Sequence, residues 1–221
     1  MKKIPDFEAK TLNLDIKENL SGDDSIALIK LINDMIQKKK QPLRIVEIGS
    51  WKGWSTMLLA DLENEVYAVD HWQGTEGTWN ADAAKKEDIF SIFRYNMTML
   101  GLQDRVHPMM MTSMDAAKIF ADNSVDMVFI DANHSFKNVC EDIQSWLPKL
   151  RHPGLLCGHD CEGYYCEFSK LKQKMIDMAP EADVLKGIGH PGVIKALHVC
   201  LHDFYFIAPG EHSRIWYYPI G

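Results

Sequence analysis

The sequence predicts an α/β protein with a Rossmann-like, doubly wound sheet of seven strands, mostly parallel and ending in a C-terminal antiparallel hairpin. Two observations support this fold class. Short apolar runs typical of buried strands alternate along the chain with segments of helical period. The last two predicted strands are joined by Pro209 and Gly210, a pair typical of a hairpin connection.

The predicted elements alternate between helix and strand along most of the chain. Helices are expected over residues 25–39, 55–62, 85–100, 113–120, 138–147, 167–178 and 191–204, the first capped by Asp23 or Asp24. Strands are expected over residues 45–48, 66–69, 105–111, 125–131, 153–158, 204–208 and 214–218. Residues 71–84, with Trp72, Gly74, Gly77 and Trp79, are expected to form a loop that closes over a ligand, or else a static surface loop.

Length and composition limit the class of protein. The 221 residues suit a single domain, which we place at residues 23–221 after an N-terminal arm of residues 1–22. A net charge of −7 argues against nucleic acid as a partner, and the lack of an apolar run of about 18 residues argues against a membrane span. Five cysteines without a recognisable secretory signal predict a cytoplasmic protein with reduced thiols. The sequence does not decide between a monomer and a homodimer.

The turn after the first predicted strand is the most informative segment. It contains Glu47, Gly49 and Gly53 and leads into a helix that opens near Ser55. Glycines let a backbone approach a ligand closely, and a helix start offers free N–H groups. Asp70, at the end of the next strand, is placed to bind the two hydroxyls of a ribose. We therefore expect a cofactor that contains adenosine.

The details of this turn favour one cofactor over another. A dinucleotide requires a G-x-G-x-x-G pattern, which this turn lacks, and the carboxylate of Glu47 would repel a pyrophosphate. The same carboxylate suits S-adenosylmethionine, which carries a sulfonium and an α-amino group. The turn resembles motif I of class I methyltransferases, and the alternative is a plain strand–helix turn with an exposed glutamate.

Three further segments resemble one group within the class I methyltransferases. They are residues 126–139 (DMVFIDANHSFKNV), 142–148 (DIQSWLP) and 153–160 (PGLLCGHD). This group is similar to methyltransferase family 24 and is related to macrocin-type O-methyltransferases and cephalosporin-hydroxylase-like proteins, and more distantly to catechol O-methyltransferase. The resemblance covers residues 25–205, and it is more specific for fold and cofactor than for substrate.

The resemblance implies a cofactor site at the carboxyl ends of the strands. The residues implied for the methionine and ribose side are Glu47, Gly49, Ser50 and Gly53, with Asp70 on the ribose hydroxyls. Trp51, Ser55 and Asp131 are expected to bind the cofactor as well. Those implied near the adenine are His71, Trp72, Thr112 and Ser113.

A metal site is implied by the same resemblance. In metal-dependent relatives, the positions of Asp131, His159 and Asp160 hold Mg²⁺ through oxygen atoms. The histidine at position 159 suits a transition metal better than magnesium, so the need for a divalent metal and its identity stay open. A zinc site that includes Cys157 and Cys161 is an alternative, although the sequence shows no second pair of ligands.

The predicted catalytic residues are Asp131, His134 and Asp160. Some relatives place a carboxylate base where this chain has Asn133, which leaves His134 as the nearest general base by residue type. The alternative is that His134 only positions Asp131. Two further histidines, at positions 198 and 202, lie one helical turn apart and are expected to be solvated.

The expected activity is methyl transfer from S-adenosylmethionine to a hydroxyl of a small molecule or sugar, with metal assistance left open. Sulfonium is a good leaving group, so the protein mainly aligns the acceptor and removes its proton. One alternative is a protein of the same fold that binds the cofactor without catalysis. A second alternative is a nicotinamide-dependent oxidoreductase. The sequence does not identify the acceptor.

Overall fold

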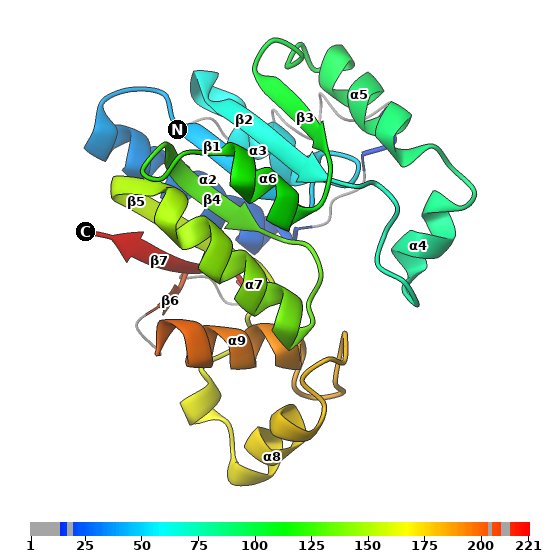
Figure 1. Ribbon diagram of the computed structural model, residues 1–221, viewed down its shortest axis with the longest axis vertical. Coiled ribbons are helices and arrows are strands. Elements are labelled where there is room, and N and C mark those ends of the chain that lie inside the picture. The colour runs from blue at the N-terminus through cyan, green and yellow to red at the C-terminus, as the bar shows by residue number, and fades with distance from the viewer. Residues whose placement is uncertain (1–13, 17–19, 203–204, 209–212) are drawn as a thin grey trace.

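The computed structural model describes residues 14–16, 20–202, 205–208 and 213–221, and in them the predicted fold class is confirmed. The strands are β1 (Arg44–Ile48), β2 (Glu65–Asp70), β3 (Val106–Met110), β4 (Val125–Ile130), β5 (Leu150–Gly158), β6 (Phe206–Ile207) and β7 (Trp216–Ile220). They form one sheet in the order β3-β2-β1-β4-β5-β7-β6 (Figure 1). β1 to β5 pair in parallel, whereas β7 pairs antiparallel with both β5 and β6.

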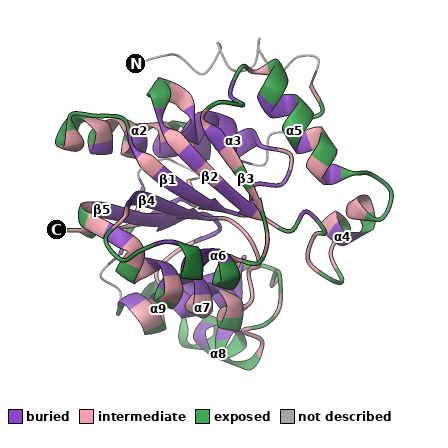
Figure 2. Cartoon of the chain, turned by 45° about the horizontal axis from the view of Figure 1, so that its top comes forward, coloured by how far each residue is buried: buried purple, intermediate pink, exposed green. Residues whose placement is uncertain are grey.

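Helices cover both faces of this sheet. They are α2 (Gly22–Lys39), α3 (Trp54–Leu59), α4 (Trp79–Ala84), α5 (Ile89–Met99), α6 (Ser113–Ile119), α7 (Phe136–Trp146), α8 (Lys170–Met178) and α9 (Pro191–Leu201), with short 3₁₀ turns at Asp61–Glu63, Leu147–Lys149 and Tyr165–Glu167. α2 and α3 lie on one face and α6, α7 and α9 on the other, while α4 lies beyond the carboxyl ends of the strands (Figure 2). None of the described helices is long and apolar enough to cross a membrane.

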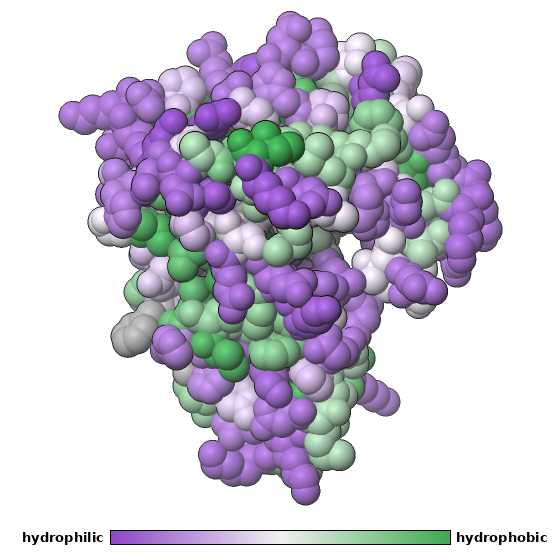
Figure 3. All heavy atoms as spheres, in the orientation of Figure 1, coloured by the Kyte–Doolittle hydropathy of each residue, from purple (hydrophilic) through white to green (hydrophobic). Residues whose placement is uncertain are grey.

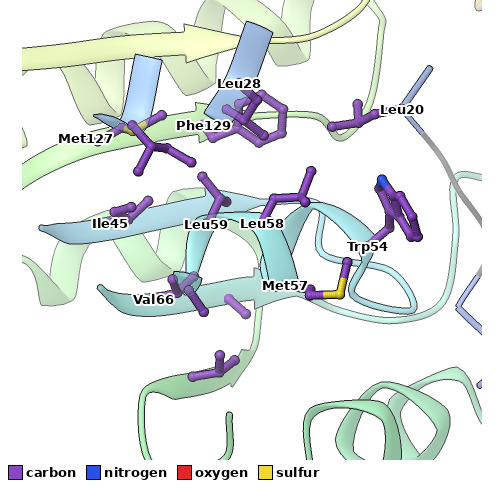
Figure 4. Close-up of a cluster of buried hydrophobic side chains, with 14 of the residues drawn as sticks. Leu20, Leu28, Ile45, Trp54, Met57, Leu58, Leu59, Val66, Met127 and Phe129 are labelled. Carbon is purple, nitrogen blue, oxygen red and sulfur yellow. The ribbon is translucent and has the colours of Figure 1, made fainter. Parts of the chain in front are cut away.

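Strand alternation divides the core into two layers. Successive side chains of a strand point to opposite faces, so Met127 and Phe129 of β4 pack towards α2 and α3 (Figure 4). Val128 and Ile130 of the same strand pack on the other face, with residues of α7 and α9. Because both faces are covered, β4 is apolar at nearly every position, as expected for a central parallel strand.

Several predicted boundaries are wrong, each for a local reason. α2 begins at Gly22 because Ser21, rather than Asp23 or Asp24, is the N-cap; Asp24 completes a capping box with Ser21. The predicted helix 55–62 ends at Leu59, and Leu62 has a positive φ of 56°. The predicted loop 71–84 contains α4, and α5 begins only at Ile89, capped by Asp88.

The loops after β1 and β4 meet where the strand order reverses. From β1 the chain continues to β2 on one side, and β4 returns on the other side, which opens a crevice at the carboxyl edge. Gly49 lies at this point with a φ of +92°, and a Cβ there would stand 2.1 Å from the carbonyl oxygen of Asp131. Only glycine allows the two strand ends to approach so closely.

The connection between α3 and β2 yields a stability prediction. Asn64 is fully buried; its Oδ1 accepts from the Leu43 amide at 2.8 Å and its Nδ2 donates to the Leu59 carbonyl at 2.9 Å. Asn64→Ala leaves two backbone groups without partners and is expected to lower the free energy of unfolding by roughly 2–4 kcal/mol. Urea denaturation measures this, with Asn33→Ala as the control, since Asn33 bonds only within α2. Equal losses in both variants would contradict the role of Asn64.

Candidate active site

The hydrogen-bond ladder of the parallel strands continues into the first residues of the loops at the carboxyl edge. The amide of Gly49 donates to the Val69 carbonyl of β2 at 2.9 Å, and the amide of Asp131 donates to the Ile48 carbonyl of β1 at 2.8 Å. The amide of His159 continues the ladder by donating to Ile130 of β4 at 3.1 Å. The residues that follow β1, β4 and β5 therefore lie side by side. Gly49, Asp131 and His159 are site residues predicted from distant segments of the sequence.

A cavity of about 480 Å³ opens over the ends of β1 to β4. Figure 3 shows the surface hollowed between the body of the molecule and the segment that carries α4. Seven of the residues predicted to bind cofactor line this cavity: Gly49, Trp51, Asp70, His71, Thr112, Ser113 and Asp131. The sequence analysis missed Asn80, Glu141 and Asp142, which line it too.

The other predicted cofactor residues are buried and are not among the residues that line this cavity: Glu47, Ser50, Gly53, Ser55 and Trp72. Trp72 is buried, with its ring packed on Phe90 and Phe93 at centroid distances of 4.7 and 5.1 Å. Its indole N–H donates to the Trp51 carbonyl at 2.7 Å. The prediction that Trp72 flanks an adenine does not agree with this position, because the ring belongs to the core and supports the turn after β1.

Asp70 joins the turn after β1 to the end of β2. Its carboxylate accepts hydrogen bonds from the amides of Trp51 at 2.9 Å and Trp72 at 2.7 Å. Each carboxylate oxygen can accept a second hydrogen bond, so Asp70 still has acceptor capacity towards the cavity that it lines.

Glu47 is a buried acid with one oxygen left unsatisfied. Its carboxylate accepts from the hydroxyl of Thr56 on α3, while Oε1 has no hydrogen-bond partner in the described part of the chain. Burial raises the pKa of Glu47 to about 7, although the hydroxyls of Ser55, Thr56 and Ser50 offset part of the effect. A buried carboxyl that retains an unpaired oxygen is a group that a cationic ligand would stabilise.

The far end of the cavity is closed by α6 and α7. Ser113 donates a short hydrogen bond to the carboxylate of Asp142, and the indole N–H of Trp146 donates to the Ser113 hydroxyl at 2.9 Å. Burial raises the pKa of Asp142 to about 7. Asp142 and Trp146 belong to the segment DIQSWLP, which the sequence analysis used for the resemblance without assigning a role to either residue.

A second cavity of about 380 Å³ adjoins the first. The two share Gly49, Trp51, Thr75, Asn80, Asp131 and Ala132. Charged and imidazole side chains line much of the second cavity, and Trp79 lies on its wall with 66% of its surface exposed. Trp79 meets Trp51 edge to face at 5.8 Å. Asp131 is the carboxylate that lines both cavities.

Asp160 is the centre of the charge network in this second cavity. It has a positive φ of 62°, in the left-handed region. Its carboxylate lies 2.9 Å from Arg214 Nη1, 3.0 Å from His134 Nε2, 3.3 Å from His159 Nδ1 and 3.4 Å from His190 Nδ1. Burial opposes ionisation, but the hydrogen bonds and charges of His134 and His159 hold the pKa of Asp160 well below its usual range.

His159 has a carboxylate at each ring nitrogen. Nε2 lies 3.1 Å from Asp24 of α2, and Nδ1 lies 3.5 Å from Asp131. Burial lowers its pKa, but these carboxylates outweigh burial and raise the pKa of His159 well above its ordinary value. Asp24 also accepts from the Arg214 amide at 2.6 Å. The sequence predicts Asp24 only as a candidate helix cap and Arg214 only as a strand residue, because neither residue belongs to a motif of the resemblance.

His134 is held between two carboxylates. Nδ1 lies 2.7 Å from Asp183 and Nε2 lies 3.0 Å from Asp160. Burial alone would lower the pKa of His134, but these two partners raise it to about 9. In this arrangement the imidazole carries its proton at neutral pH, so the geometry favours a positioning role over that of a general base.

The predicted metal ligands do not fit magnesium. One ligand atom from each of Asp131, His159 and Asp160 lies within 4.8 Å of the others. However, Mg²⁺ prefers oxygen ligands, and position 159 supplies a nitrogen. In addition, Asp160 Oδ1, the oxygen nearest His159, is bonded to the guanidinium of Arg214. A cation placed there would be repelled by this second positive charge.

The alternative zinc site is not assembled. Cys157 and Cys161 belong to different core layers, and their thiols donate to the carbonyls of Val128 and Gly163. His202 ends α9 in a left-handed conformation, and His198 stacks on Tyr165 at 4.4 Å. These two histidines therefore do not act as a pair.

Comparison with known proteins identifies the family. Residues 46–161, more than half of the chain, match the model of methyltransferase family 24, a methyltransferase domain. The chain belongs to this family. The match begins within β1 and ends just after Asp160, so it includes the strand ends that line both cavities.

The relatives agree with this assignment at the level of the fold. Cofactor-bound Rv0187 from MTB has a TM-score of 0.61 at 17% identity, covering 97% of this chain and 88% of its own. The O-methyltransferase NovP has a TM-score of 0.59 at 13% identity, covering 88% of this chain and 78% of its own. An uncharacterized protein of Sinorhizobium fredii, y4gI, is 30% identical over 128 residues, which are 55% of this chain and 13% of that protein. The chain thus spans only a small part of this relative.

The raised pKa of Glu47 predicts how stability changes with pH. The carboxyl has a pKa of about 7 in the folded chain against an ordinary value of 4.5, so above pH 4.5 the unfolded chain releases a proton that the folded chain keeps. Stability is therefore lost as the pH rises towards 7, by roughly 2–3 kcal/mol between pH 5 and 8, and Glu47→Gln removes this loss. Urea denaturation at both pH values measures the difference, with the exposed Glu167→Gln as control. An unchanged pH dependence in Glu47→Gln would contradict the assignment.

Proposed function

We propose that this protein is an S-adenosylmethionine-dependent methyltransferase that transfers a methyl group to a hydroxyl of a small, polar acceptor. The observation that carries the proposal is the pair of adjoining cavities at the strand-order reversal, which share Gly49 and Asp131, with the buried acid Glu47 two residues before Gly49 in β1. The family assignment supports methyl transfer. It lends no support to the nicotinamide-dependent alternative.

The first cavity suits the cofactor. Gly49 lies on the cavity wall, and Asp70 offers acceptors for ribose hydroxyls. Glu47 supplies negative charge beneath the turn, where the amino group and sulfonium of the cofactor would compensate an otherwise unpaired buried acid. Thr112, Ser113 and Asp142, which line the same cavity, would contact the adenine.

The second cavity suits the acceptor. The sulfonium methyl would lie near the shared wall, and the acceptor oxygen would attack it from the second cavity in line with the carbon–sulfur bond. The oxygen–carbon bond forms as the carbon–sulfur bond breaks, which leaves a neutral thioether and releases the hydroxyl proton. Asp131, on the wall between donor and acceptor, is placed to accept that proton.

The lining of the second cavity indicates the class of acceptor. Its histidines, Arg214 and carboxylates offer hydrogen bonds to a ligand with several polar groups, whereas Trp51 and Trp79 offer ring surfaces. Sugars and similar polyhydroxylated molecules have both kinds of surface. Since magnesium does not fit the predicted ligands, no step of this reaction is assigned to it.

A non-catalytic protein that binds the cofactor is the second candidate. The observation that favours it is the saturated state of Asp160, whose carboxylate faces Arg214 and three histidines. Transfer of a labelled methyl group from S-adenosylmethionine to any member of a panel of polyhydroxylated acceptors would exclude this candidate. Cofactor binding without any transfer across the panel would support it.

Cofactor binding is tested at Asp70. Losing charge-assisted hydrogen bonds to the ribose should weaken binding by roughly 1.5–3 kcal/mol, so Asp70→Ala is expected to lower the affinity for S-adenosylmethionine about 10- to 100-fold in calorimetry. Asp122→Ala, which removes a surface carboxylate paired with Lys149, is the control and should bind normally. Unchanged affinity in Asp70→Ala, or tighter binding of NAD, would refute the proposed cofactor site.

The catalytic role of Asp131 is tested by Asp131→Asn. Loss of the proton acceptor should lower kcat by at least about 100-fold on an acceptor identified in the panel, while cofactor affinity changes less. Asp177→Asn, at a surface carboxylate near Lys195, is the matched control. Normal turnover in Asp131→Asn would show that another group takes the proton. Asp160 is less suitable for this test, because its removal would leave several buried cations without their counter-charge.

A further inference from the structure

A second group of side chains that could bind a metal lies in the second cavity, which is proposed to hold the acceptor. One nitrogen from each of His134 and His190 and one oxygen of Asp160 lie within 4.8 Å of one another. His134 Nε2 is 3.0 Å from Asp160 Oδ2, and the two imidazole rings meet edge to face with their centroids 4.5 Å apart. All three residues line the second cavity, so the group is open to a ligand from solution.

Each of these three side chains is oriented by a further partner. Asp183 lies 2.7 Å from Nδ1 of His134, and Glu162 lies 2.7 Å from Nδ1 of His190. Arg214 Nη1 bonds the opposite oxygen of Asp160, Oδ1, at 2.9 Å. Histidines that bind metals usually donate their other ring N–H to a carboxylate, and ligating carboxylates are usually hydrogen-bonded as well. The arrangement therefore has both ligands and their orienting partners.

From this geometry we propose that His134, Asp160 and His190 bind one divalent transition-metal ion of the zinc type. Two imidazoles and one carboxylate suit zinc, cobalt or iron and do not suit magnesium. Three protein ligands leave positions for water or for an oxygen of the acceptor, whose orientation would then depend on the ion. The binding of the ion does not rest on the proposed function, whereas its contact with a methyl acceptor does.

Two observations place the ion in this group rather than among Asp131, His159 and Asp160. Asp160 Oδ2, the oxygen that does not bond the Arg214 guanidinium, faces His134 at 3.0 Å, whereas His159 Nδ1 and His190 Nδ1 lie 3.3 and 3.4 Å from Oδ1. The group of Asp131, His159 and Asp160 therefore has no imidazole on Oδ2 among its three members. The accessibility of the two imidazoles from solution also differs: the side chain of His159 is 3% exposed, whereas that of His134 is 24% exposed. The carboxylates of Glu162 and Asp183 add negative charge close to the proposed ion, which Coulomb attraction favours.

Cobalt(II) binding tests the proposal. The full chain is depleted of metal with a chelator and titrated with Co²⁺, whose visible absorption reports the ligand set, and Zn²⁺ then competes for the site. We expect one equivalent of Co²⁺ to bind, no displacement by Mg²⁺, and at least a 100-fold loss of affinity in His134→Ala and in His190→Ala. Asp183→Asn, which removes only an orienting partner, should weaken binding about 10- to 100-fold. His107→Ala, at a histidine paired with Glu65 on the outer strands, should bind as the unmodified chain does.

Several outcomes would overturn the proposal. They are no binding of Co²⁺ or Zn²⁺, a sulfur-to-cobalt charge-transfer band that shows cysteine ligation, or binding that survives both histidine substitutions and is lost in His159→Gln. Circular dichroism and thermal unfolding of each variant separate ligand loss from misfolding, and Asp183→Asn keeps the test informative if a histidine variant unfolds. Calorimetry with S-adenosylmethionine on the metal-depleted chain tests the proposed function separately, since its cofactor site contains none of the three ligands.

Discussion

A side chain at position 49 would collide with the backbone of Asp131, and this single contact controls how the two halves of the sheet meet. Because Gly49 has only hydrogen at that position, the loops after β1 and β4 lie against each other at the point where the strand order reverses. Both cavities share this boundary, with Asp131 on it. In the proposed function, the distance between the cofactor and the acceptor would be set by the backbone of these two neighbouring strands.

Buried charge is the second feature on which the site depends. Asp24, Asp131 and Asp160 face His159 or Arg214, and apart from Arg214, which is 34% exposed, these side chains have little exposure to water, so each ionised group needs its partners to remain charged. Removing one member of such a network leaves the others uncompensated, at a cost of about 3–5 kcal/mol in typical buried pairs. The network therefore constrains which substitutions can be made at the site without loss of the fold. It also orients the imidazoles that line the second cavity.

The same network joins segments that are far apart in the sequence. Asp24 belongs to the first turn of α2, where it also completes the capping box of Ser21, and Arg214 precedes β7. The carboxylate of Asp24 lies 3.1 Å from His159 Nε2, just after β5, and accepts a hydrogen bond from the Arg214 amide at 2.6 Å. It thus links the first turn of α2 and the segment before β7 to the end of β5. Local helix capping and the organisation of the site share one side chain. A change at Asp24 would consequently disturb both.

The motifs in the sequence indicated the family by resemblance, whereas apolar periodicity and the glycine turn, which are local signals, indicated the sheet and the edge of it where the candidate site lies. The sequence placed Gly49, Asp70, Asp131 and Asp160 correctly at the carboxyl edge, since parallel strands all end there. Only the tertiary structure decided which way side chains turn, and so it placed Trp72 in the core, brought His190 and Arg214 to Asp160, and brought Asp24 to His159. These residues come from segments that carry no common spacing, and their proximity arises from packing between elements. No periodicity in a linear chain encodes that kind of contact.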